Sequence, residues 1–333
     1  MQQVAERAGV AVSSVSRVLS GHPNVSEVMR NRVTDAVSAL GYEMDLLAQS
    51  LRRGSTMTVG FVISNIANPM LSEVALGAET SLRNAGYAML LTNSMEDPEL
   101  DCEHIRLLTQ RRVDGLLLSV SDETYQGTID AIYKTALPVV LVDREMRVSG
   151  RVSAVQADHA IGVAEAARQL AMLGHKRIAL VNGPQTLRPP RERANTLRRI
   201  SRQFSVSSSV RSGKFTAAHG EESTAGLLAQ SEPPTAIIAG SNQILVGVMR
   251  ELRRLGYRIP QDISVVTCDD VPLAELMVPS LAAIERDNYE IGVIAASLLS
   301  ELLNGATPRV VTVPTSFHLR PSIGPPANAA SAR

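Results

Sequence analysis

Residues 4–19 of the chain read VAERAGVAVSSVSRVL, and they hold two short helical patterns that meet at Gly9. Apolar residues recur on both sides of this glycine at the i, i+3, i+4 spacing that lets two helices pack on each other. These residues are Val4, Ala5, Ala8, Val15, Val18 and Leu19. The second helix keeps an outward face that is polar apart from Val12 and carries one arginine, Arg17. Such a face indicates a helix that inserts into the major groove of DNA, whose width accepts it.

The sequence around this helix pair resembles the helix-turn-helix of the lactose-repressor (LacI/GalR) family. The family pattern is roughly AGVSxxTVSRVLN, and residues 8–19 read AGVAVSSVSRVL. Three further family segments follow at the family's spacing: VSE at 25–27, LGY at 40–42 and AQSLR at 48–52. The resemblance implies a transcriptional regulator, in most cases a repressor, that binds a near-palindromic operator as a homodimer.

The resemblance also assigns contacts with operator DNA. Val12, Ser13 and Arg17 take base-facing positions, and Arg17 can donate to O6 and N7 of a guanine. Ser14 and Ser16 take phosphate-facing positions. The other positions that the resemblance assigns to DNA are Asn24, Ala48 and Leu51.

A third helix and a linker complete this part of the chain. Ser26 is the expected N-cap of the third helix and Gly41 its expected end. Its predicted core face consists of Val33, Ala36, Val37 and Leu40. We predict a DNA-binding domain at residues 1–43 and a linker at 44–56 with a short hinge helix. In the family this helix folds on operator DNA and wedges a leucine, here Leu51, into the minor groove; alternatively, the leucines of 46–51 pack on the module.

Several positions depart from the family pattern on the DNA side. Ala11 replaces a serine that caps the recognition helix, and such a cap contributes about 1 kcal/mol. Met44 and Asp45 replace Pro-Asn, which places a carboxylate near phosphates. We therefore expect weaker DNA binding. The alternative function is a small-molecule-binding protein whose DNA-binding module is weakened or vestigial.

Composition excludes few functions. Lys plus Arg equals Asp plus Glu at 33 each, so the DNA-binding interpretation rests on pattern rather than on charge. The two cysteines, Cys102 and Cys268, lie far apart and suggest neither a disulfide nor a metal site. A basic-then-apolar leader and an apolar run near 18 residues are both lacking, which predicts a soluble, cytoplasmic protein without a membrane partner.

From residue 57 onward, short apolar runs alternate with amphipathic stretches. The predicted strands are Thr58–Ile63, Ala88–Thr92, Gly115–Val120, Pro138–Val142, Val152–Gln156, Arg177–Asn182, Thr235–Ala239, Ile263–Cys268 and Val310–Val313. The predicted helices are Ser72–Ala85, Glu99–Arg111, Ile161–Leu173, Ile244–Leu255 and Tyr289–Leu303. Near-continuous apolar strands followed by helices predict doubly wound parallel sheets, and the strands are about twice as many as one such sheet needs.

The predicted fold is therefore an all-α helix-turn-helix module followed by an α/β core of two lobes. The resemblance implies that this core is like the periplasmic sugar-binding proteins, with three crossings between the lobes. The predicted domains are 57–157 with 287–315 for the N-terminal lobe and 158–286 with 316–324 for the C-terminal lobe. Residues 325–333 are predicted to be a disordered tail.

Loops that follow strands lie at the carboxyl edge of open α/β sheets, where ligands bind. By resemblance, the effector-binding positions are Asn68, Asp143, Arg193, Phe215, Ser241, Asp269 and Arg286. The residues alone leave other roles open, since Asn68 suits a turn, and Asp143 and Asp269 suit helix caps. Phe215 is equally compatible with the core, and Arg193 with a solvated helix face.

The composition of the cleft differs from that of relatives. Ser241 stands in a segment where an acidic residue is usual, and Arg286 stands where a neutral residue is frequent. Together with Arg193 and Arg144, they predict a cationic cleft. Arginine suits carboxylate and phosphate, so the expected effectors include sugar acids and sugar phosphates as well as sugars.

An enzyme is the main rival class. The sequence lacks the GxSxG, Walker, GxGxxG and HExxH motifs, and its six histidines are scattered. We predict no catalysis, no cofactor and no metal site. Dimer contacts are expected along residues 71–82. Effector binding is expected to shift the lobes and, through the hinge helices, to change operator affinity.

Overall fold

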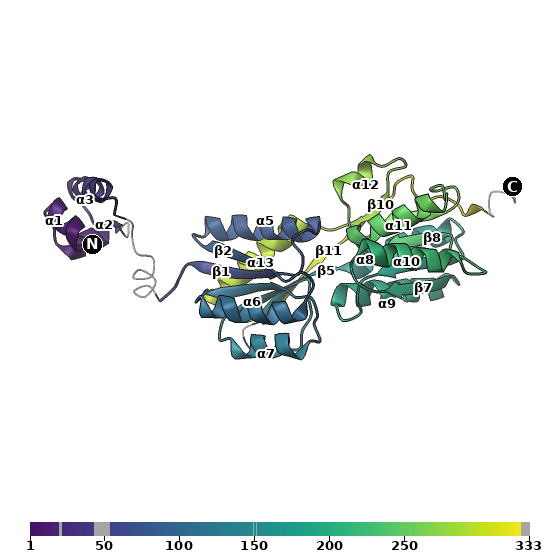
Figure 1. Ribbon diagram of the computed structural model, residues 1–333, viewed down its shortest axis with the longest axis horizontal. Helices are drawn as coiled ribbons and strands as arrows, with labels where there is room; N and C mark the ends of the chain where they lie inside the picture. The colour runs from purple at the N-terminus through teal and green to yellow at the C-terminus, as the bar shows by residue number, and fades with distance from the viewer. Residues whose placement is uncertain (20–21, 43–53, 149, 151, 328–333) are drawn as a thin grey trace. The chain divides into compact units, whose positions relative to one another are not determined.

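The computed structural model describes residues 1–19, 22–42, 54–148, 150 and 152–327 (Figure 1). The chain divides into two compact units, Met1–Thr56 and Met57–Arg333. The predicted hinge positions Ala48 and Leu51, and most of the predicted tail, lie outside the described residues.

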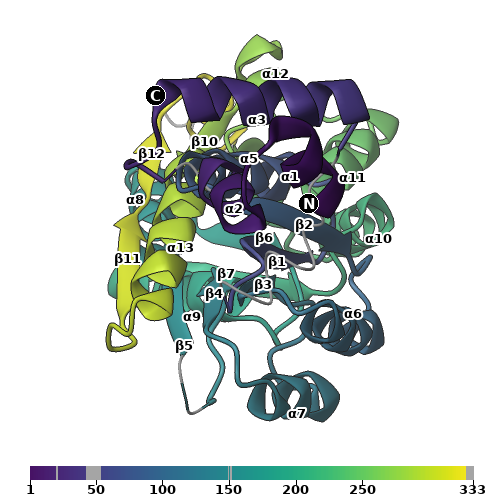
Figure 2. The same ribbon diagram turned by 90° about the vertical axis from the view of Figure 1, so that its left-hand side faces the viewer.

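The first unit contains three helices, α1 Gln2–Ala8, α2 Val12–Leu19 and α3 Glu27–Leu40. They pack together around a small apolar core (Figure 2). Its buried members are Val4, Ala5, Ala8, Val15, Val18, Val33 and Ala36. Gly9 ends α1 with a φ of 63°, a left-handed conformation that glycine adopts without strain. The sequence pattern thus folds as the predicted helix pair with a third helix across it.

The ends of α3 follow their sequence signals, but its last turn does not. The Ser26 hydroxyl accepts a hydrogen bond from the Met29 backbone N–H, and Gly41 ends the helix at a φ of 54°. Leu40, predicted to face the core, is instead 39% exposed. α3 has 14 residues whereas α1 and α2 have 7 and 8, so the final turn of α3 extends past the shorter helices.

The second unit contains two six-stranded sheets. The sheet of the N-terminal lobe has the order β11-β5-β4-β3-β1-β2, with every strand pair parallel. Its strands are β1 Thr58–Ile63, β2 Ala88–Asn93, β3 Gly115–Ser119, β4 Val139–Val142, β5 Val152–Asp158 and β11 Val310–Pro314. α5 Pro69–Asn84 and α13 Asn288–Leu303 cover one face (Figure 1). α6 Pro98–Gln110 and α7 Gln126–Lys134 cover the other.

The sheet of the C-terminal lobe has the order β12-β10-β9-β8-β6-β7. Its strands are β6 Arg177–Asn182, β7 Ser207–Ser212, β8 Ala236–Ala239, β9 Ser264–Thr267, β10 Ala282–Glu285 and β12 Ser316–His318. β12 runs antiparallel to β10, so this sheet is parallel except at one edge. α8 His159–Met172 and α9 Arg188–Gln203 cover one face; α10 Ala217–Leu228 and α11 Asn242–Arg254 cover the other, and α12 Pro272–Leu276 is a short helix after β9.

The central strands explain why both sheets are stable. β3, β4, β8 and β9 are buried along their whole length, because helices cover both faces of each sheet. Burying one such Val, Leu or Ile side chain contributes roughly 1.5–3 kcal/mol. The chain passes between the lobes after β5, between β10 and α13, and between β11 and β12. These three passages bring the carboxyl ends of the strands of both sheets to the gap between the lobes.

The predicted fold class is confirmed: a helical module precedes two α/β lobes built on parallel sheets. Three strands, β7, β10 and β12, were not predicted, nor were α7, α9, α10 and α12. β7 reads SSSVRS at the sheet edge and lacks the apolar pattern of a buried strand. No helix among the described residues is long and apolar enough to cross a membrane.

Candidate functional site

The DNA-facing positions predicted on α2 lie on its outer surface within the first unit. Val12 is 45% exposed, and Ser13 and Arg17 are exposed. Ser14 and Ser16 are half-buried at the edges of this face. Asn24, in the turn between α2 and α3, is also exposed. The exposed face of α2 therefore presents the methyl groups of Val12, serine hydroxyls and the Arg17 guanidinium, which are groups that can contact the edges of bases.

The second site is a cavity between the two lobes. All seven predicted effector positions line one small cavity of about 40 Å³. They are Asn68, Asp143, Arg193, Phe215, Ser241, Asp269 and Arg286. This inner cavity adjoins an outer one of about 680 Å³, and both are lined by Arg144, Phe215 and Gln243. The volume of the outer cavity lies within the range of small-molecule sites.

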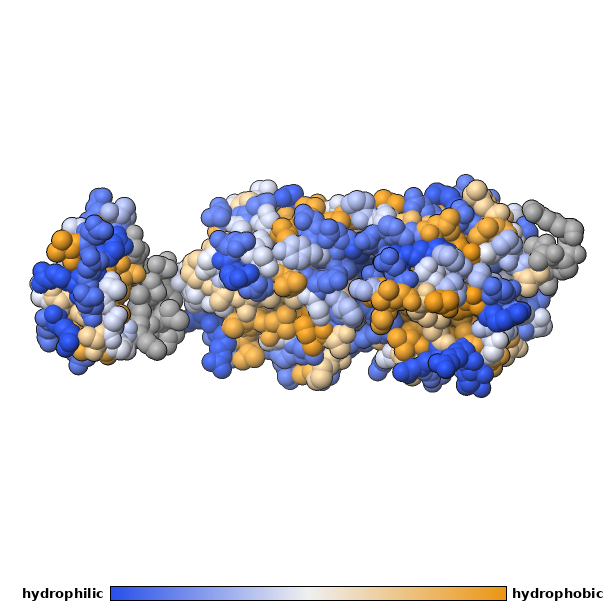
Figure 3. Space-filling view, turned by 90° about the horizontal axis from the view of Figure 1, so that it is seen from above, coloured by the Kyte–Doolittle hydropathy of each residue, from blue (hydrophilic) through white to orange (hydrophobic). Residues whose placement is uncertain are grey.

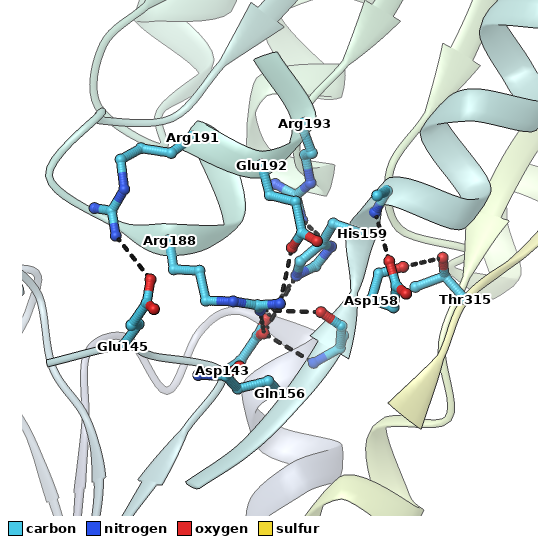
Figure 4. Close-up of polar contacts among 12 residues, drawn as sticks. Asp143, Glu145, Gln156, Asp158, His159, Arg188, Arg191, Glu192, Arg193 and Thr315 are labelled. Atoms are coloured by element: carbon cyan, nitrogen blue, oxygen red, sulfur yellow. Dashed lines mark hydrogen bonds and ion pairs between the residues drawn. The ribbon is translucent and has the colours of Figure 1, made fainter. Parts of the chain in front are cut away.

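Asp143 follows β4 and lines the inner cavity from the N-terminal lobe. Its backbone has a φ of 51°, which is uncommon for a residue other than glycine. Its carboxylate contacts the Nε2 atom of His159 at 3.0 Å and Nη1 of Arg188 at 3.3 Å, and it accepts the Ala157 backbone N–H at 3.1 Å (Figure 4). Burial alone would raise the pKa of this carboxyl group, but the His159 contact and nearby guanidiniums hold that pKa well below its usual range. Asp143 is therefore ionised, and it caps no helix.

His159, the first residue of α8, joins Asp143 to Arg193. Its Nδ1 atom lies 3.3 Å from Nη2 of Arg193. Arg193, on α9, also donates through Nη1 to the Gly240 carbonyl at 2.7 Å. Burial lowers the pKa of the His159 ring to about 3, and the nearby positive charges of Arg193 and Arg286 act in the same direction against the attraction of Asp143. The ring is therefore neutral at neutral pH.

Asp269 follows β9 and lines the cavity from the C-terminal lobe. One of its oxygens accepts from Nη2 of Arg286 at 2.9 Å, and the other accepts the Asn242 backbone N–H at 2.9 Å. Asn242 then donates through Nδ2 to the Asn68 side chain in the other lobe at 3.0 Å. Arg286 also donates through Nε to Asn288 at 3.0 Å. The buried Asp269–Arg286 ion pair is thus connected by hydrogen bonds, through Asn242 and Asn288, to the N-terminal lobe.

The remaining predicted positions combine a structural role with a place on the cavity wall. Asn68 caps α5 by accepting the Met70 N–H, and Ser241 caps α11 by accepting the Ile244 N–H. Phe215 is half-buried, and its ring lies against Gly183, where a Cβ atom would come within 2.2 Å of it. Asn68, which suits a turn by its sequence, and Ser241 thus cap helices and still reach the cavity, whereas the helix-cap interpretation fails for Asp143.

The cavity is not cationic, which corrects the expectation from the sequence. The inner wall holds three acids and three arginines: Glu96, Asp143, Asp269, Arg144, Arg193 and Arg286. Arg286 is paired with Asp269, and Arg144 donates to the Val120 carbonyl at 2.6 Å. The arginines read from the sequence are thus balanced by acids that the fold brings beside them.

Three residues of this site escaped sequence analysis. His159 and Arg188 contact Asp143 from elements that begin after the first passage between lobes. Glu123, in the N-terminal lobe, accepts from Nη2 of Arg191 at 2.8 Å and from the Arg188 backbone N–H at 2.9 Å. Their partners are 16 to 68 residues away in sequence, so no local pattern marks them.

One group among the described residues brings possible metal ligands together. Asp270, Glu285 and His318 offer ligand atoms within 4.8 Å of one another. Arg320, however, donates to both oxygens of Asp270 at 2.7 Å. Since this guanidinium already holds the carboxylate, we assign no metal to the group.

Comparisons with known proteins identify the family. The model of bacterial regulatory proteins of the lacI family matches residues 1–45, and that of a periplasmic binding protein-like domain matches residues 167–323. The ribose operon repressor of Escherichia coli (strain K12) is 32% identical over 303 residues, which cover 90% of this chain and 91% of the repressor. The chain belongs to the lacI family of bacterial regulatory proteins.

Other lacI-family proteins are similar over 80% or more of the chain. Catabolite control protein A of Priestia megaterium is 29% identical over 327 residues, covering 96% of this chain and 97% of that protein. The structure of the Lac repressor dimer bound to operator and the anti-inducer ONPF matches with a TM-score of 0.84 at 26% identity, covering 96% of this chain and 97% of that one. A LacI family transcriptional regulator from Enterococcus faecium with bound ribose matches with a TM-score of 0.71 at 26% identity, covering 80% and 99%. The predicted family is confirmed, and these relatives are transcriptional regulators.

Proposed function

We propose that this lacI-family regulator is a transcriptional repressor that binds a near-palindromic operator as a homodimer. Its effector is a sugar, sugar acid or sugar phosphate held between the lobes, and it acts in the cytoplasm, where operator DNA lies. The observation that carries the proposal is the inner cavity, because seven side chains from both lobes line it in a chain that also exposes a helix-turn-helix face. The relatives bound to operator and to ribose support it.

Exposed apolar side chains support the homodimer. Leu76 on α5 is 57% exposed, whereas Leu71 and Leu82 at the ends of the expected dimer segment are buried within the lobe. On α12 and just after it, Leu276 and Val278 are also largely exposed. Figure 3 looks onto the face that carries α5 and α12 and shows apolar patches on both lobes. Because a monomer seldom exposes extended apolar surface, this face is suited to a second copy of the chain.

Two polar chains lead from the cavity to the beginning of α5, the helix of this dimer face. The first runs from Arg286 through Asp269 and Asn242 to Asn68, the N-cap of α5. The second runs from Arg286 to Asn288, whose Nδ2 donates to Glu73 on α5 at 2.9 Å. An effector that competes for Asp269 or Arg286 would loosen both chains and so change the dimer geometry that sets operator affinity.

Selection from a random double-stranded DNA pool with the full-length chain tests the DNA-binding part. We expect two related half-sites in inverted order, as a two-fold dimer requires. Arg17→Ala should weaken binding by roughly 1–3 kcal/mol and relax the preference for guanine at one position of each half-site. Arg258→Ala is the control, because Arg258 pairs with Asp262 on the surface of the second unit.

Matched ligands test the effector. We would measure the melting temperature of the full-length chain with D-ribose, D-ribonate and D-ribose 5-phosphate, since a ligand of the folded state raises it. The balanced charge of the inner wall favours ribose over the two anions. If only an anion stabilises the chain, the effector is a sugar acid or phosphate and the charge argument is wrong.

A second function is favoured by one observation. Ala11, immediately before α2, has no hydroxyl to cap this helix or to bind phosphate. A small-molecule-binding protein with a vestigial DNA-binding module would show the ligand response without enrichment of any DNA sequence.

A further inference from the structure

His159 lies behind the wall of the inner cavity, in contact with two of the residues that line it, Asp143 and Arg193. It is 1% exposed, and its ring lies between Asp143 of the N-terminal lobe and Arg193 of the C-terminal lobe (Figure 4). We infer that His159 is a positioning residue that fixes Asp143 and Arg193 against each other across the two lobes. This inference rests on the proposed function, in which both partners contact the effector.

The chemistry of the two partners dictates one tautomer of the ring. A guanidinium has only donors, so Nδ1 of His159, 3.3 Å from Nη2 of Arg193, must be the acceptor and carry no proton. The proton of the neutral ring is then on Nε2, which donates to the Asp143 carboxylate at 3.0 and 3.2 Å. The result is a directed chain from Arg193 through His159 to Asp143.

The charged groups around the ring act in opposite directions. Asp143 after β4 favours a charged ring, as does Glu192 on α9, which accepts the backbone N–H of His159. Arg193 on α9 and Arg286 after β10 oppose it. A protonated ring would also bring an N–H of Nδ1 against the Arg193 guanidinium, where two donors would meet. The geometry therefore excludes the imidazolium, and the ring acts as a neutral connector.

Both partners need such a connector. Asp143 has an uncommon left-handed backbone, which persists only where surrounding contacts hold it. Arg193 is 3% exposed, and its Nε–H has no hydrogen-bond partner among the described residues. Because Nη1 bonds the Gly240 carbonyl and Nη2 bonds His159, the guanidinium is fixed while Nε–H keeps its capacity to donate. This leaves a donor at the cavity wall for an oxygen of the effector, while Asp143 supplies an acceptor.

Two conservative variants separate the two contacts of the ring. The amide oxygen of Asn can take the place of Nδ1 but cannot reach Asp143, and the amide nitrogen of Gln can take the place of Nε2. His159→Asn should therefore retain the contact with Arg193, and His159→Gln the contact with Asp143. His159→Leu removes both. A matched control is His175→Gln, because His175 is equally buried but bonds Thr235 and Gly324 away from the cavity.

The first test requires no effector. Long-range nitrogen–proton NMR spectra of the full-length chain with labelled histidine report charge and tautomer, and His159→Gln identifies the signal. We expect the Nε2–H tautomer with no titration between pH 5 and 8, and Arg193→Gln should shift the Nδ1 signal. A charged ring or an Nδ1–H tautomer at neutral pH would overturn the inference, even if the chain regulates transcription as proposed.

The second test uses D-ribose, D-ribonate and D-ribose 5-phosphate in calorimetric titrations. For whichever compound binds the wild type, we expect His159→Leu to weaken binding at least tenfold and Asn and Gln to recover part of the loss. His175→Gln should lower the melting temperature while leaving affinity unchanged. Equal affinity of His159→Leu and the wild type would overturn the inference. Binding of none of the three would count against the proposed effector class, and the NMR result would still decide the role of His159.

Discussion

The two aspartates of the cavity take matching places in the two lobes but have different partners. Asp143 follows β4 of one lobe and Asp269 follows β9 of the other, and both line the inner cavity. Asp269 is paired with the charged Arg286 at 2.9 Å. The shortest contact of Asp143 is with His159, a neutral ring, and the Arg188 beside it is shared with Glu192.

This difference separates two tasks. The Asp269–Arg286 pair cancels its own charge and extends polar chains toward α5, so it suits transmission between the cavity and the dimer face. The Asp143–His159 pair leaves the carboxylate charge in place and orients Arg193, so it suits recognition of a polyhydroxy ligand. Two carboxylates that look alike in sequence thus differ because of what the fold brings beside them.

The largest expected effect is on stability. Arg286→Ala leaves the carboxylate of Asp269 buried without its charged partner, and loss of one partner of a buried pair costs about 3–5 kcal/mol. His159→Leu removes a neutral partner while Arg188 and the Ala157 N–H remain, which corresponds to about 1–3 kcal/mol. Urea unfolding measures both. A larger loss of unfolding free energy for His159→Leu than for Arg286→Ala would contradict the different roles of the two aspartates.

The pH dependence of stability distinguishes the two pairs further. The pKa of His159 falls from 6.5 to about 3 on folding, so below pH 6.5 the unfolded chain binds a proton that the folded chain does not. This depressed pKa makes stability decline as pH falls from 6.5 towards 3, by up to about 1.4 kcal/mol per pH unit. His159→Gln should reduce that slope between pH 6.5 and 4.5 in urea unfolding. Asn288→Ala should leave the slope as in the wild type, because Asn288 contacts neither His159 nor Asp143.

The smallest expected effect concerns transmission. Asn288→Ala breaks the link from Arg286 to Glu73 but replaces no residue of the cavity wall, and Arg286 keeps its pairing with Asp269. Effector affinity should persist, while the ratio of operator affinities without and with effector should fall about 2- to 10-fold, the equivalent of one hydrogen bond. Mobility-shift titrations measure this ratio. An unchanged ratio would show that the polar chain through Asn288 does not couple the effector to operator binding.

Much of the fold could be predicted from local patterns. The bounds of β1 and β6 agree with the sequence prediction, because buried parallel strands are continuous apolar runs. β7 and α9 could not be found in this way, since β7 is a polar edge strand and the buried stripe of α9 lies among six arginines. Short-range periodicity detects elements with a continuous or regular apolar pattern. It misses elements such as β7 and α9, in which polar or charged residues dominate the sequence.

The residues of the site also fall into two groups, those that the sequence could predict and those that it could not. The seven cavity positions follow strand ends or belong to a family motif, so they could be located, and the structure gathers them. The charge balance could not be predicted, because the pairing of Arg286 with Asp269 joins residues on separate strand ends. Nor could His159 be found, because its role depends on a contact with Arg193, 34 residues away. Their assignment to an effector remains a prediction.

The affinity of the full-length chain for its selected operator, measured with and without the sugar that stabilises it, decides whether the chain is a ligand-controlled DNA-binding regulator. We predict tight binding that Arg17→Ala reduces and that the sugar changes by a coupling free energy of typically 1–3 kcal/mol. Operator affinity that the bound sugar leaves unchanged, or a chain that selects no DNA sequence, would contradict this prediction.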